Sequence, residues 1–437
     1  MHSFFKLPFY PLLPDDPNLS LQRGRIHEFF KYTKPHRKLL EQIELVIIDE
    51  ISMVRADLID AIDRILRVYS HNLREPFGGK QLLLVGDVFQ LEPVVKNDER
   101  EILNRAYPTP YFFSARVFSQ IDLVSIELQK VYRQTDSVFV SVLDHIRTNT
   151  AGAADLQLLN TRYGSHIEES EADMYITLAT RRDTVDSINE KKLAELAGEP
   201  ITFEGSIEGD FPESSLPTSQ ELVLKPGAQI IFIKNDFDRR WVNGTIGVIA
   251  GIDEEEETIY VITDDGKECD VKRESWRNIR YRYNEKTKEI EEEVLGSFTQ
   301  YPIRLAWAIT VHKSQGLTFS RVVIDFTGGV FAGGQAYVAL SRCTSLDGIQ
   351  LKKPINRADI FVRPEIVNFA GRFNDRQAID KALKQAQADV QYAAAARAFD
   401  KGDMEECLEQ FFRAIHSRYD IEKPVPRRLI RRKLGII

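Results

Sequence analysis

The sequence predicts an α/β protein with more than one domain. The chain has 437 residues, a length that is typical of two or three domains. Short apolar runs at residues 45–48 and 81–85 have the composition of buried parallel strands. Between these runs, residues 53–68 carry apolar side chains at the spacing of a helix with one buried face. Strand, helix and strand in this order predict a right-handed parallel crossover.

Two carboxylates follow the first predicted strand. Asp49 and Glu50 are expected at the carboxyl end of that strand, the rim of the sheet where α/β proteins bind ligands. In nucleotide hydrolases the first such acid holds Mg²⁺, and the second orients or deprotonates the attacking water. The alternative is a strand that ends in ordinary acidic turn residues, and this segment alone does not decide between the two interpretations.

A polar loop follows the second predicted strand. Gly86 lets the chain turn sharply, so that Asp87 and Gln90 are expected to point back toward the first two acids. A glutamine in this place can hydrogen-bond the terminal phosphate of a nucleotide or the attacking water. For Gln90 the alternative is an ordinary loop amide.

Five segments, in order, resemble the motifs of superfamily 1 helicases. The Asp-Glu pair at residues 49–50 resembles motif II, and the sequence GDxxQLxPV at residues 86–94 resembles motif III. Motifs IV, V and VI have counterparts at residues 131–134, 308–318 and 335–342. The chain is most similar to the RecD/PIF branch (superfamily 1B), whose members translocate 5′→3′ on single-stranded DNA. The matches cover roughly residues 1–352 and occur in the expected order.

The resemblance implies a division into three parts. Residues 1–145 would be a RecA-like P-loop NTPase motor domain that lacks its first strand and phosphate loop. Residues 146–360 would be a second RecA-like motor domain, with a small β-barrel inserted at about 248–300, where short alternating strands and polar turns follow one another. Residues 361–437 are expected to form a C-terminal helical appendage with a basic tail at 427–433.

The phosphate loop of such motors is missing from the sequence. No G-x-x-x-x-G-K-[ST] segment occurs, and Gly78-Gly79-Lys80 precedes a strand, whereas a phosphate loop follows one. Residues 1–8 resemble the end of motif Ia, so we expect the sequence to start inside its first motor domain. We therefore expect weak ATP binding and slow or absent hydrolysis by the polypeptide as written. A truncated gene model and a true remnant are both open as the origin.

The resemblance also implies the residues that bind the nucleotide. Asp49 would hold Mg²⁺, Glu50 the attacking water, and Gln90 the γ-phosphate of ATP. Arg133 and Arg342 would approach the γ-phosphate from opposite sides, because permanently charged guanidiniums suit the charge on a transferred phosphoryl group. For each arginine the alternative is an ion pair at a domain interface.

Single-stranded DNA is the implied partner. Eight residues are expected to contact it: Ser3, Phe4, Thr180, Arg181, Thr310, His312, Lys313 and Ser314. The motif V residues among them would grip a phosphate and sense the nucleotide cleft together with Gly316, which allows close backbone approach. A structural hydrogen bond is the alternative role for His312, and a solvated helix terminus is the alternative at Arg181. Binding would depend on salt and little on base sequence.

Charge and cysteine content limit the remaining classes of function. The net charge of −8 argues weakly against a nucleic-acid partner, but much of the acid lies in runs at 253–257 and 289–293, which are expected to be solvated loops. The three cysteines have neither zinc-site nor disulfide-framework spacing, which suits a cytoplasmic protein. No run has the length of a membrane span, and the N-terminus has no signal-peptide pattern.

The leading interpretation is an ATP-dependent DNA helicase that couples ATP hydrolysis to unwinding. ATP and Mg²⁺ are the expected cofactors, and single-stranded DNA and a DNA fork are the expected partners of a monomer. The family has roles in DNA repair, recombination and telomere maintenance. A DNA-binding remnant without hydrolysis is the alternative, and an interaction protein that binds a protein partner through its C-terminal helices is a third interpretation.

Overall fold

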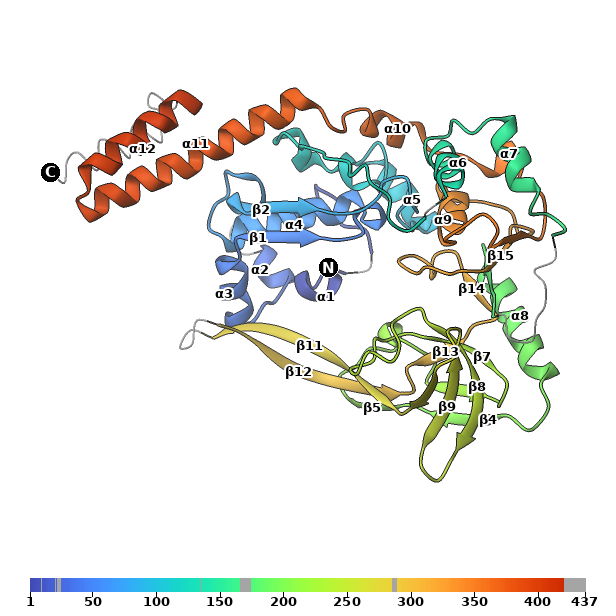
Figure 1. Cartoon of the computed structure of the whole chain (residues 1–437). Coiled ribbons are helices and arrows are strands. Elements are labelled where there is room, and N and C mark those ends of the chain that lie inside the picture. Colours follow the sequence, from blue (N-terminus) through green and yellow to red (C-terminus); the bar gives the residue numbers. More distant parts are fainter. Residues whose placement is uncertain are drawn as a thin grey trace. The chain divides into compact units, whose positions relative to one another are not determined.

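The computed structural model describes residues 1–8, 10–19, 21, 25–134, 136–165, 174–284 and 289–419 (Figure 1). The chain divides into two compact units, Met1–Ile121 with Lys130–Val367 and Asp122–Gln129 with Asn368–Ile437. The larger unit contains two α/β regions and a group of antiparallel sheets, and the smaller unit is helical. In the described ranges, no helix combines the length and the apolar character that crossing a membrane requires.

The first α/β region is built on a two-stranded parallel sheet. β1 (Leu45–Ile48) pairs with β2 (Gln81–Leu84), and α4 (Ala56–Tyr69) lies between them in the chain. The predicted parallel crossover is therefore confirmed. The predicted burial of the strands is wrong for one face, since Ile47 is 59% exposed whereas the neighbouring Ile48 is buried. Alternate side chains of a strand point to opposite faces of the sheet, and other described residues cover only one of these two faces.

Helix α4 is buried on more than one side. Its apolar residues are buried as predicted, but so are Asp57 and Asp60. Their carboxylates accept hydrogen bonds from the backbone N–H groups of Leu12 and Val117, each at 3.0 Å. These polar side chains therefore fasten the loop at Leu12 and the 3-10 helix η5 to α4. The other elements of the region are α1 (His2–Phe5), η1 (Pro17–Leu19), α2 (Arg25–Phe29), α3 (Lys34–Gln42), η2 (Ile51–Met53), η3 (Pro76–Gly79), α5 (Asn97–Asn104), η4 (Phe112–Ser114) and η5 (Arg116–Ser119).

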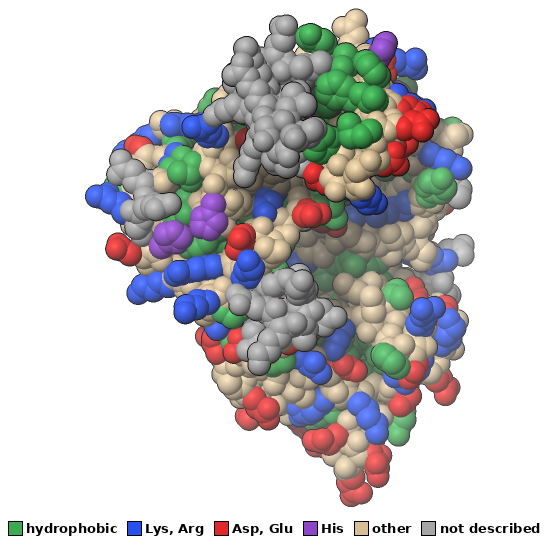
Figure 2. Space-filling model, turned by 90° about the vertical axis from the view of Figure 1, so that its left-hand side faces the viewer, with side chains coloured by type: hydrophobic (Ala, Val, Ile, Leu, Met, Phe, Trp, Pro, Cys, Tyr) green, Lys and Arg blue, Asp and Glu red, His purple; other side chains and the backbone are tan. Residues whose placement is uncertain are grey.

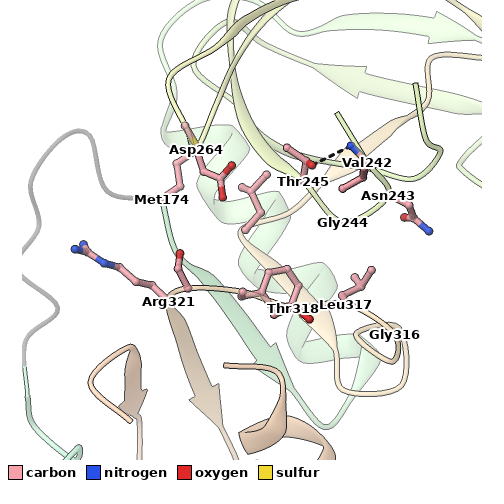
Figure 3. A pocket seen from close by; sticks show the side chains of 13 residues that line it. Met174, Val242, Asn243, Gly244, Thr245, Asp264, Gly316, Leu317, Thr318 and Arg321 are labelled. Atoms are coloured by element: carbon pink, nitrogen blue, oxygen red, sulfur yellow. Dashed lines mark hydrogen bonds between the residues drawn. The ribbon is translucent and has the colours of Figure 1, made fainter. Parts of the chain in front are cut away.

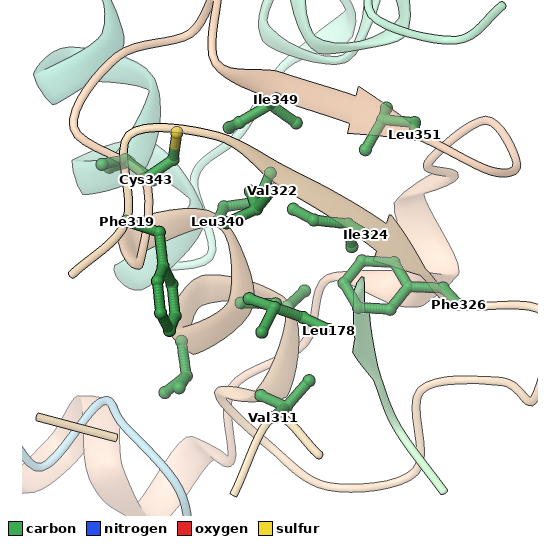
Figure 4. Close-up of a cluster of buried hydrophobic side chains, with 14 of the residues drawn as sticks. Leu178, Val311, Phe319, Val322, Ile324, Phe326, Leu340, Cys343, Ile349 and Leu351 are labelled. Carbon is green, nitrogen blue, oxygen red and sulfur yellow. The ribbon is translucent and has the colours of Figure 1, made fainter. Parts of the chain in front are cut away.

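The second α/β region is a four-stranded parallel sheet. Its strand order is β14 (Ala308–Thr310), β3 (Ile176–Ala179), β15 (Val322–Asp325) and β16 (Ile349–Leu351). The accompanying helices are α6 (Ser137–Arg147), α7 (Ala153–Asn160), α8 (Arg182–Glu195), α9 (Gln335–Ser341), η7 (Arg357–Asp359) and α10 (Pro364–Ala370). Apolar side chains of the strands pack with Leu340 of α9 in a buried core (Figure 4). Leu91, from the loop after β2, belongs to the same core.

Antiparallel strands occupy the chain between α8 and β14. Five of them pair in the order β10 (Glu268–Val271), β9 (Thr258–Thr263), β8 (Ile246–Asp253), β7 (Gln229–Phe232) and β13 (Ile303–Leu305). The predicted β-barrel is wrong, because β10 and β13 are the two edges of an open sheet in the described part of the chain. A barrel closes only when its edge strands pair. Here the next two strands after β10 leave the sheet, and the chain returns to it at β13 on the opposite edge.

Those strands form a long hairpin. β11 (Glu274–Asn284) and β12 (Glu289–Gln300) pair with β5 (Ser206–Gly209) in a separate sheet, and β11 packs on α3 (Figure 1). A further pair consists of β4 (Ile201–Glu204) and β6 (Glu221–Leu224), with η6 (Glu213–Ser215) between them in the chain.

The two acidic runs differ in structure. The prediction of a loop at 289–293 is wrong, because this run lies in β12, where Glu293 forms an ion pair with Arg280 of β11 at 3.8 Å. The run at 253–257 does lie at a turn, between β8 and β9. Acidic side chains gather at the lowest end of the face in Figure 2, whereas Lys and Arg side chains gather on its left-hand side. The acidic total therefore does not describe every part of the surface.

The smaller unit is a helical hairpin. α11 (Arg376–Lys401) and α12 (Met404–Ser417) lie side by side, joined by Gly402, whose φ of 81° ends the first helix (Figure 1). Asp403 caps the second helix by accepting a hydrogen bond from the N–H of Glu406. The predicted helical character is confirmed for the described residues, and the basic run at 427–433 lies outside them.

Candidate nucleotide- and nucleic-acid-binding site

The acidic rim of the first sheet depends on a close approach of two strand ends. Glu50 adopts a left-handed conformation with φ of 51°, and Oδ1 of Asp49 accepts a hydrogen bond from its N–H at 2.8 Å. Gly86 follows β2 with φ of 151°, and a Cβ there would lie 2.9 Å from the backbone nitrogen of Ile51. Glycine is therefore required where the loop leaves β2.

The loop after Gly86 turns back toward the acid pair. Oδ1 of Asp87 accepts a hydrogen bond from the N–H of Phe89 at 3.0 Å, and its Oδ2 accepts one from Nε2 of Gln90 at 3.4 Å. Burial and the carboxylates of Asp49 and Asp87 raise the pKa of Glu50. Three acids are thus close enough to interact, which is the placement that the two strand ends predict.

Arg342, at the end of α9, is a buried cation held by neutral oxygens. It is 1% exposed. Its Nε donates to the carbonyl of Val338 at 3.0 Å, its Nη2 to the hydroxyl of Ser341 at 3.0 Å, and its Nη1 to the carbonyl of Leu317 at 3.3 Å. Burial and the nearby charge of Arg133 lower the pKa of Arg342 to about 10. Among the described residues it has no carboxylate within ion-pair distance, so the alternative of a structural ion pair is not realised.

Charges from the two α/β regions influence one another. Arg133 is exposed, and its Nη1 donates to the carbonyl of Ser341 at 3.4 Å. Arg342 and Arg133 each oppose the rise in the pKa of Glu50, so both guanidiniums act on this carboxylate. Acids of the first region and guanidiniums near α9 are therefore close enough to interact.

A contact between the two regions was not predicted. Gly334, which precedes α9 with φ of 76°, lies so close to the loop after β2 that a Cβ would overlap the carbonyl oxygens of Phe89 and Gln90. Leu91 then inserts into the core of the second region. Burial and the carboxylate of Asp87 raise the pKa of Tyr337, the third residue of α9. The Gly333-Gly334 pair ahead of motif VI is the sequence signal that could have indicated this approach.

Gln134 was also missed as a link between segments. Its Nε2 donates to the carbonyls of Ser341 and Cys343, each at 3.0 Å. The side chain is buried, so these bonds tie the segment before α6 to the end of α9.

The motif V residues differ in what they present to solvent. Ser314 is fully buried, and its hydroxyl donates to the carbonyl of Val311 at 2.8 Å, so its side chain does not face a ligand. Thr310 accepts a hydrogen bond from the N–H of Lys313 at 3.2 Å. Lys313 itself is exposed, and Gly316 has φ of 75° with open space around it.

His312 is a partly buried residue of the same turn. Its ring stacks on Phe331 with 6.5 Å between ring centroids, and burial lowers its pKa. The structural hydrogen bond that the sequence left open for His312 is not seen among the described residues, and the ring packs on Phe331 instead.

The remaining predicted DNA contacts lie at two separate places. Thr180 is 4% exposed, and its hydroxyl has no hydrogen-bond partner among the described residues. The Nε of Arg181 donates to the carbonyl of Gly328 at 3.0 Å. Phe4 lies in α1 against Phe5, with ring centroids 4.9 Å apart. The backbone of the predicted contact at position 3 belongs to α1, and its side chain lies outside the described part.

A pocket of about 330 Å³ opens beside motif V (Figure 3). Gly316 and Leu317 line one side, and the turn at residues 242–246 lines another. The carboxylate of Asp264 points toward the pocket, whereas Arg321 extends away from it (Figure 3). Burial and the charge of Asp265 raise the pKa of Asp264. No sequence pattern predicts a ligand for this pocket.

Mg²⁺ has a partial set of candidate ligands at the acidic rim. No group of three or more His, Cys, Asp or Glu side chains in the described ranges is arranged to hold a metal. Mg²⁺ at nucleotide sites, however, needs only one or two carboxylates, with phosphates and waters completing the shell. Asp49 fits this requirement, since it directly follows β1 at the carboxyl end of the strand, and Asp87 is the second carboxylate near Glu50.

Known proteins resemble the chain in sequence. Residues 1–151 match a family described as PIF1-like helicase. ATP-dependent DNA helicase Pif1 of Campylobacter jejuni is 33% identical over 365 residues, which are 80% of this chain and 78% of that protein. Human ATP-dependent DNA helicase PIF1 is 35% identical over 312 residues, 70% of this chain. The chain spans about half the length of that relative, 45%.

Solved structures resemble it in fold. Bacteroides sp. Pif1 in complex with ADP-AlF4 has a TM-score of 0.75 and 38% sequence identity, covering 85% of this chain and 82% of that one. The same protein bound to single-stranded DNA has a TM-score of 0.60 with the same identity and coverage. The predicted fold class, two RecA-like motor domains, is confirmed by this likeness.

Proposed function

Because the chain belongs to the PIF1-like helicase family, we propose that it is an ATP-dependent DNA helicase motor that moves 5′→3′ on single-stranded DNA. The single observation that carries this proposal is the meeting of charges from two α/β regions. Glu50 of the first region lies within the electrostatic reach of Arg133 and Arg342. A triphosphate between the regions would bring its transferred phosphoryl group to both guanidiniums.

The side chains at the rim have separate roles in this proposal. Glu50 accepts the proton of the attacking water, and its raised pKa brings it closer to the range in which a general base works well. Gln90, held by Asp87, contacts the γ-phosphate. Arg342 is fixed by its bonds to neutral oxygens, so its charge is oriented before the nucleotide arrives.

ATP and Mg²⁺ are the proposed cofactors. Support for the nucleotide comes from the Bacteroides relative solved with ADP-AlF4. Asp49 would hold Mg²⁺, which neutralises phosphate charge when it is bound. Motion follows from the position of the site, because a nucleotide that contacts both regions favours their approach and its hydrolysis releases them.

DNA is the proposed substrate, as a single strand and at a fork. The Bacteroides relative is known in complex with single-stranded DNA, and another solved structure, 37% identical to this chain, describes DNA unwinding at forked duplex DNA by Pif1 helicases. On this chain Lys313, Arg181 and Thr310 are proposed to contact the DNA strand. Thr310 is the last residue of β14 and Lys313 follows it, while Arg181 follows the neighbouring parallel strand β3. We further propose that the chain acts as a cytoplasmic monomer and that the helical hairpin binds a protein partner. Support for such a partner comes from an exposed apolar stripe on α12: Met404, Leu408 and Phe412.

Glu50→Gln tests the hydrolytic part of the proposal. We expect slow hydrolysis by the chain as written, because its sequence contains no G-x-x-x-x-G-K-[ST] loop, and we expect single-stranded DNA to stimulate it. The variant keeps the shape of the side chain but cannot accept a proton, so DNA-stimulated phosphate release should fall by about a hundredfold or more. DNA binding should remain.

Two outcomes would redirect the interpretation. Equal hydrolysis by the variant and the unchanged chain would exclude Glu50 as the base. Robust DNA-stimulated hydrolysis by the unchanged chain would contradict the weak activity expected from a sequence without a G-x-x-x-x-G-K-[ST] segment.

A further inference from the structure

We propose that Arg304 is a further phosphate-binding residue, which holds the backbone of a bound single strand together with Lys313 and Arg182. The inference rests on the proposed function, since the phosphate is a phosphodiester of the DNA substrate. Arg304 lies outside the motifs that resemble the helicase family, which begin again at residue 308. It therefore adds a contact that those motifs do not imply.

Arg304 is a partly buried cation without a partner. It lies in β13, the edge strand of the open sheet, where its backbone pairs with Ile231 of β7. Its guanidinium has no hydrogen-bond or ion-pair partner in the part of the chain that the structure describes. Burial lowers the pKa of Arg304, which shows that water compensates its charge only in part. Such a charge is normally paired with an anion, because desolvation otherwise costs folding free energy.

The neighbours of Arg304 are cations as well. Burial, and after it the charges of Arg304 and Arg182, lower the pKa of Lys313. Asp186 opposes this effect, but its carboxylate already lies 3.4 Å from Arg182, and both side chains are exposed. Exposed pairs of this kind contribute little stability. Lys313 thus lies near two arginines and near one carboxylate that already pairs with Arg182, and in the described part of the chain no carboxylate pairs with Arg304.

The elements that carry the cluster suit a phosphodiester. Arg182 is the first residue of α8, whose N-cap residue, Arg181, makes no side-chain cap, so that helix N–H groups are available there. Lys313 follows β14, which pairs with β3 directly before α8. The buried hydroxyl of Thr180, at the end of β3, has no partner among the described residues. Fixed cations and N–H donors bind a backbone phosphate through its charge and shape and do not contact the bases.

Arginine suits the position better than lysine would. The planar guanidinium can donate two parallel hydrogen bonds to two phosphate oxygens, and its weaker hydration makes partial burial less costly. Arg304 on the sheet edge and Lys313 on the motif V turn would thus hold one phosphate from two different elements.

Binding of a fluorescent oligo-dT strand, measured by anisotropy over a series of salt concentrations, tests the proposal. Arg304→Gln should weaken binding by about tenfold and reduce the slope of log affinity against log salt by about one. Arg304→Lys should retain the slope and lose part of the affinity. The matched control is Arg376→Gln, which removes the same charge from an exposed position in α11 and should leave both quantities unchanged.

Thermal unfolding without DNA separates this role from a structural one. Because Arg304 is an unpaired charge in the folded chain, Arg304→Gln should unfold at the same or a higher temperature than the unchanged chain. A lowered unfolding temperature together with an unchanged salt slope would overturn the proposal. If the unchanged chain binds DNA and Arg304→Gln has the same affinity and slope, the inference fails and the proposed function stands. If the unchanged chain does not bind DNA at all, both fail.

A free phosphate is the other source of the same chemistry. If the site binds the phosphodiesters of a DNA strand and not free phosphate, inorganic phosphate should displace oligo-dT no more strongly than chloride does at equal ionic strength. Stronger competition by inorganic phosphate that disappears in Arg304→Gln would assign the cluster to a free phosphate, and would overturn the proposal for DNA.

Discussion

Because of the imidazole of His312, we expect the stability of the folded chain to fall at acidic pH. Burial against Phe331 lowers its pKa, so the folded chain holds this ring neutral where the unfolded chain protonates it. The unfolded state then binds more protons, and stability falls as pH decreases through the ordinary histidine range near about 6.5. Thermal unfolding of His312→Gln should therefore lose less stability between about pH 7 and pH 5.5 than that of the unchanged chain. Parallel curves for the two proteins would show that His312 titrates normally.

Individual residues also mark what the sequence could reveal about the site. Asp49, Glu50, Asp87 and Gln90 follow two short apolar runs, and parallel pairing of those runs is enough to bring them together. Ser314 shows the limit of this reasoning. A motif names the residue types of a turn, but whether a hydroxyl faces solvent depends on the backbone carbonyl that it reaches, here that of Val311.

The start of α9 is the element on which the contact between the regions depends. Gly334→Ala would place a Cβ against the carbonyls of Phe89 and Gln90, and backbone atoms cannot move aside as a flexible side chain can. Gly266→Ala is the matched control, because Gly266 has φ of 79° and no atom near its missing Cβ. The control should lose about 1 kcal/mol from its conformation alone. Gly334→Ala should lose about 1–3 kcal/mol more by overpacking, measured by denaturant unfolding.

Equal losses in the two variants would mean that the loop after β2 does not lie against α9.

Elements such as the parallel crossover and the helical hairpin could be predicted because their signals are local. The barrel could not be, since closure depends on which edges pair. Residues 274–300 alternate as strands do, but nothing in the pattern shows that β11 and β12 leave the sheet to pair with β5. The contact of Gly334 with Gln90 joins residues far apart in the sequence, so no window of the sequence contains it.

Within the larger unit, Leu91 connects the acidic rim of the first sheet to the buried core of the second α/β region. It is fully buried among side chains of the second region, although it follows β2 of the first. Gln90 immediately precedes it, so the proposed γ-phosphate contact and the anchoring side chain are adjacent in one loop. Arg342 directly follows α9, so we expect a shift of α9 to move Arg342 and, through the core that Leu91 joins, to displace Gln90 as well.

Leu91→Ala tests this connection. The truncation should cost about 2–5 kcal/mol of unfolding free energy, as for other buried leucines. Leu83→Ala, a half-exposed leucine of β2, is the control and should cost less than about 1 kcal/mol. Because Leu91 and Gly334 hold the same loop, the losses in Leu91→Ala and Gly334→Ala should not add in the double variant. Strictly additive losses would show that the loop is held at two independent points. A small loss in Leu91→Ala would show that the core of the second α/β region does not depend on this side chain.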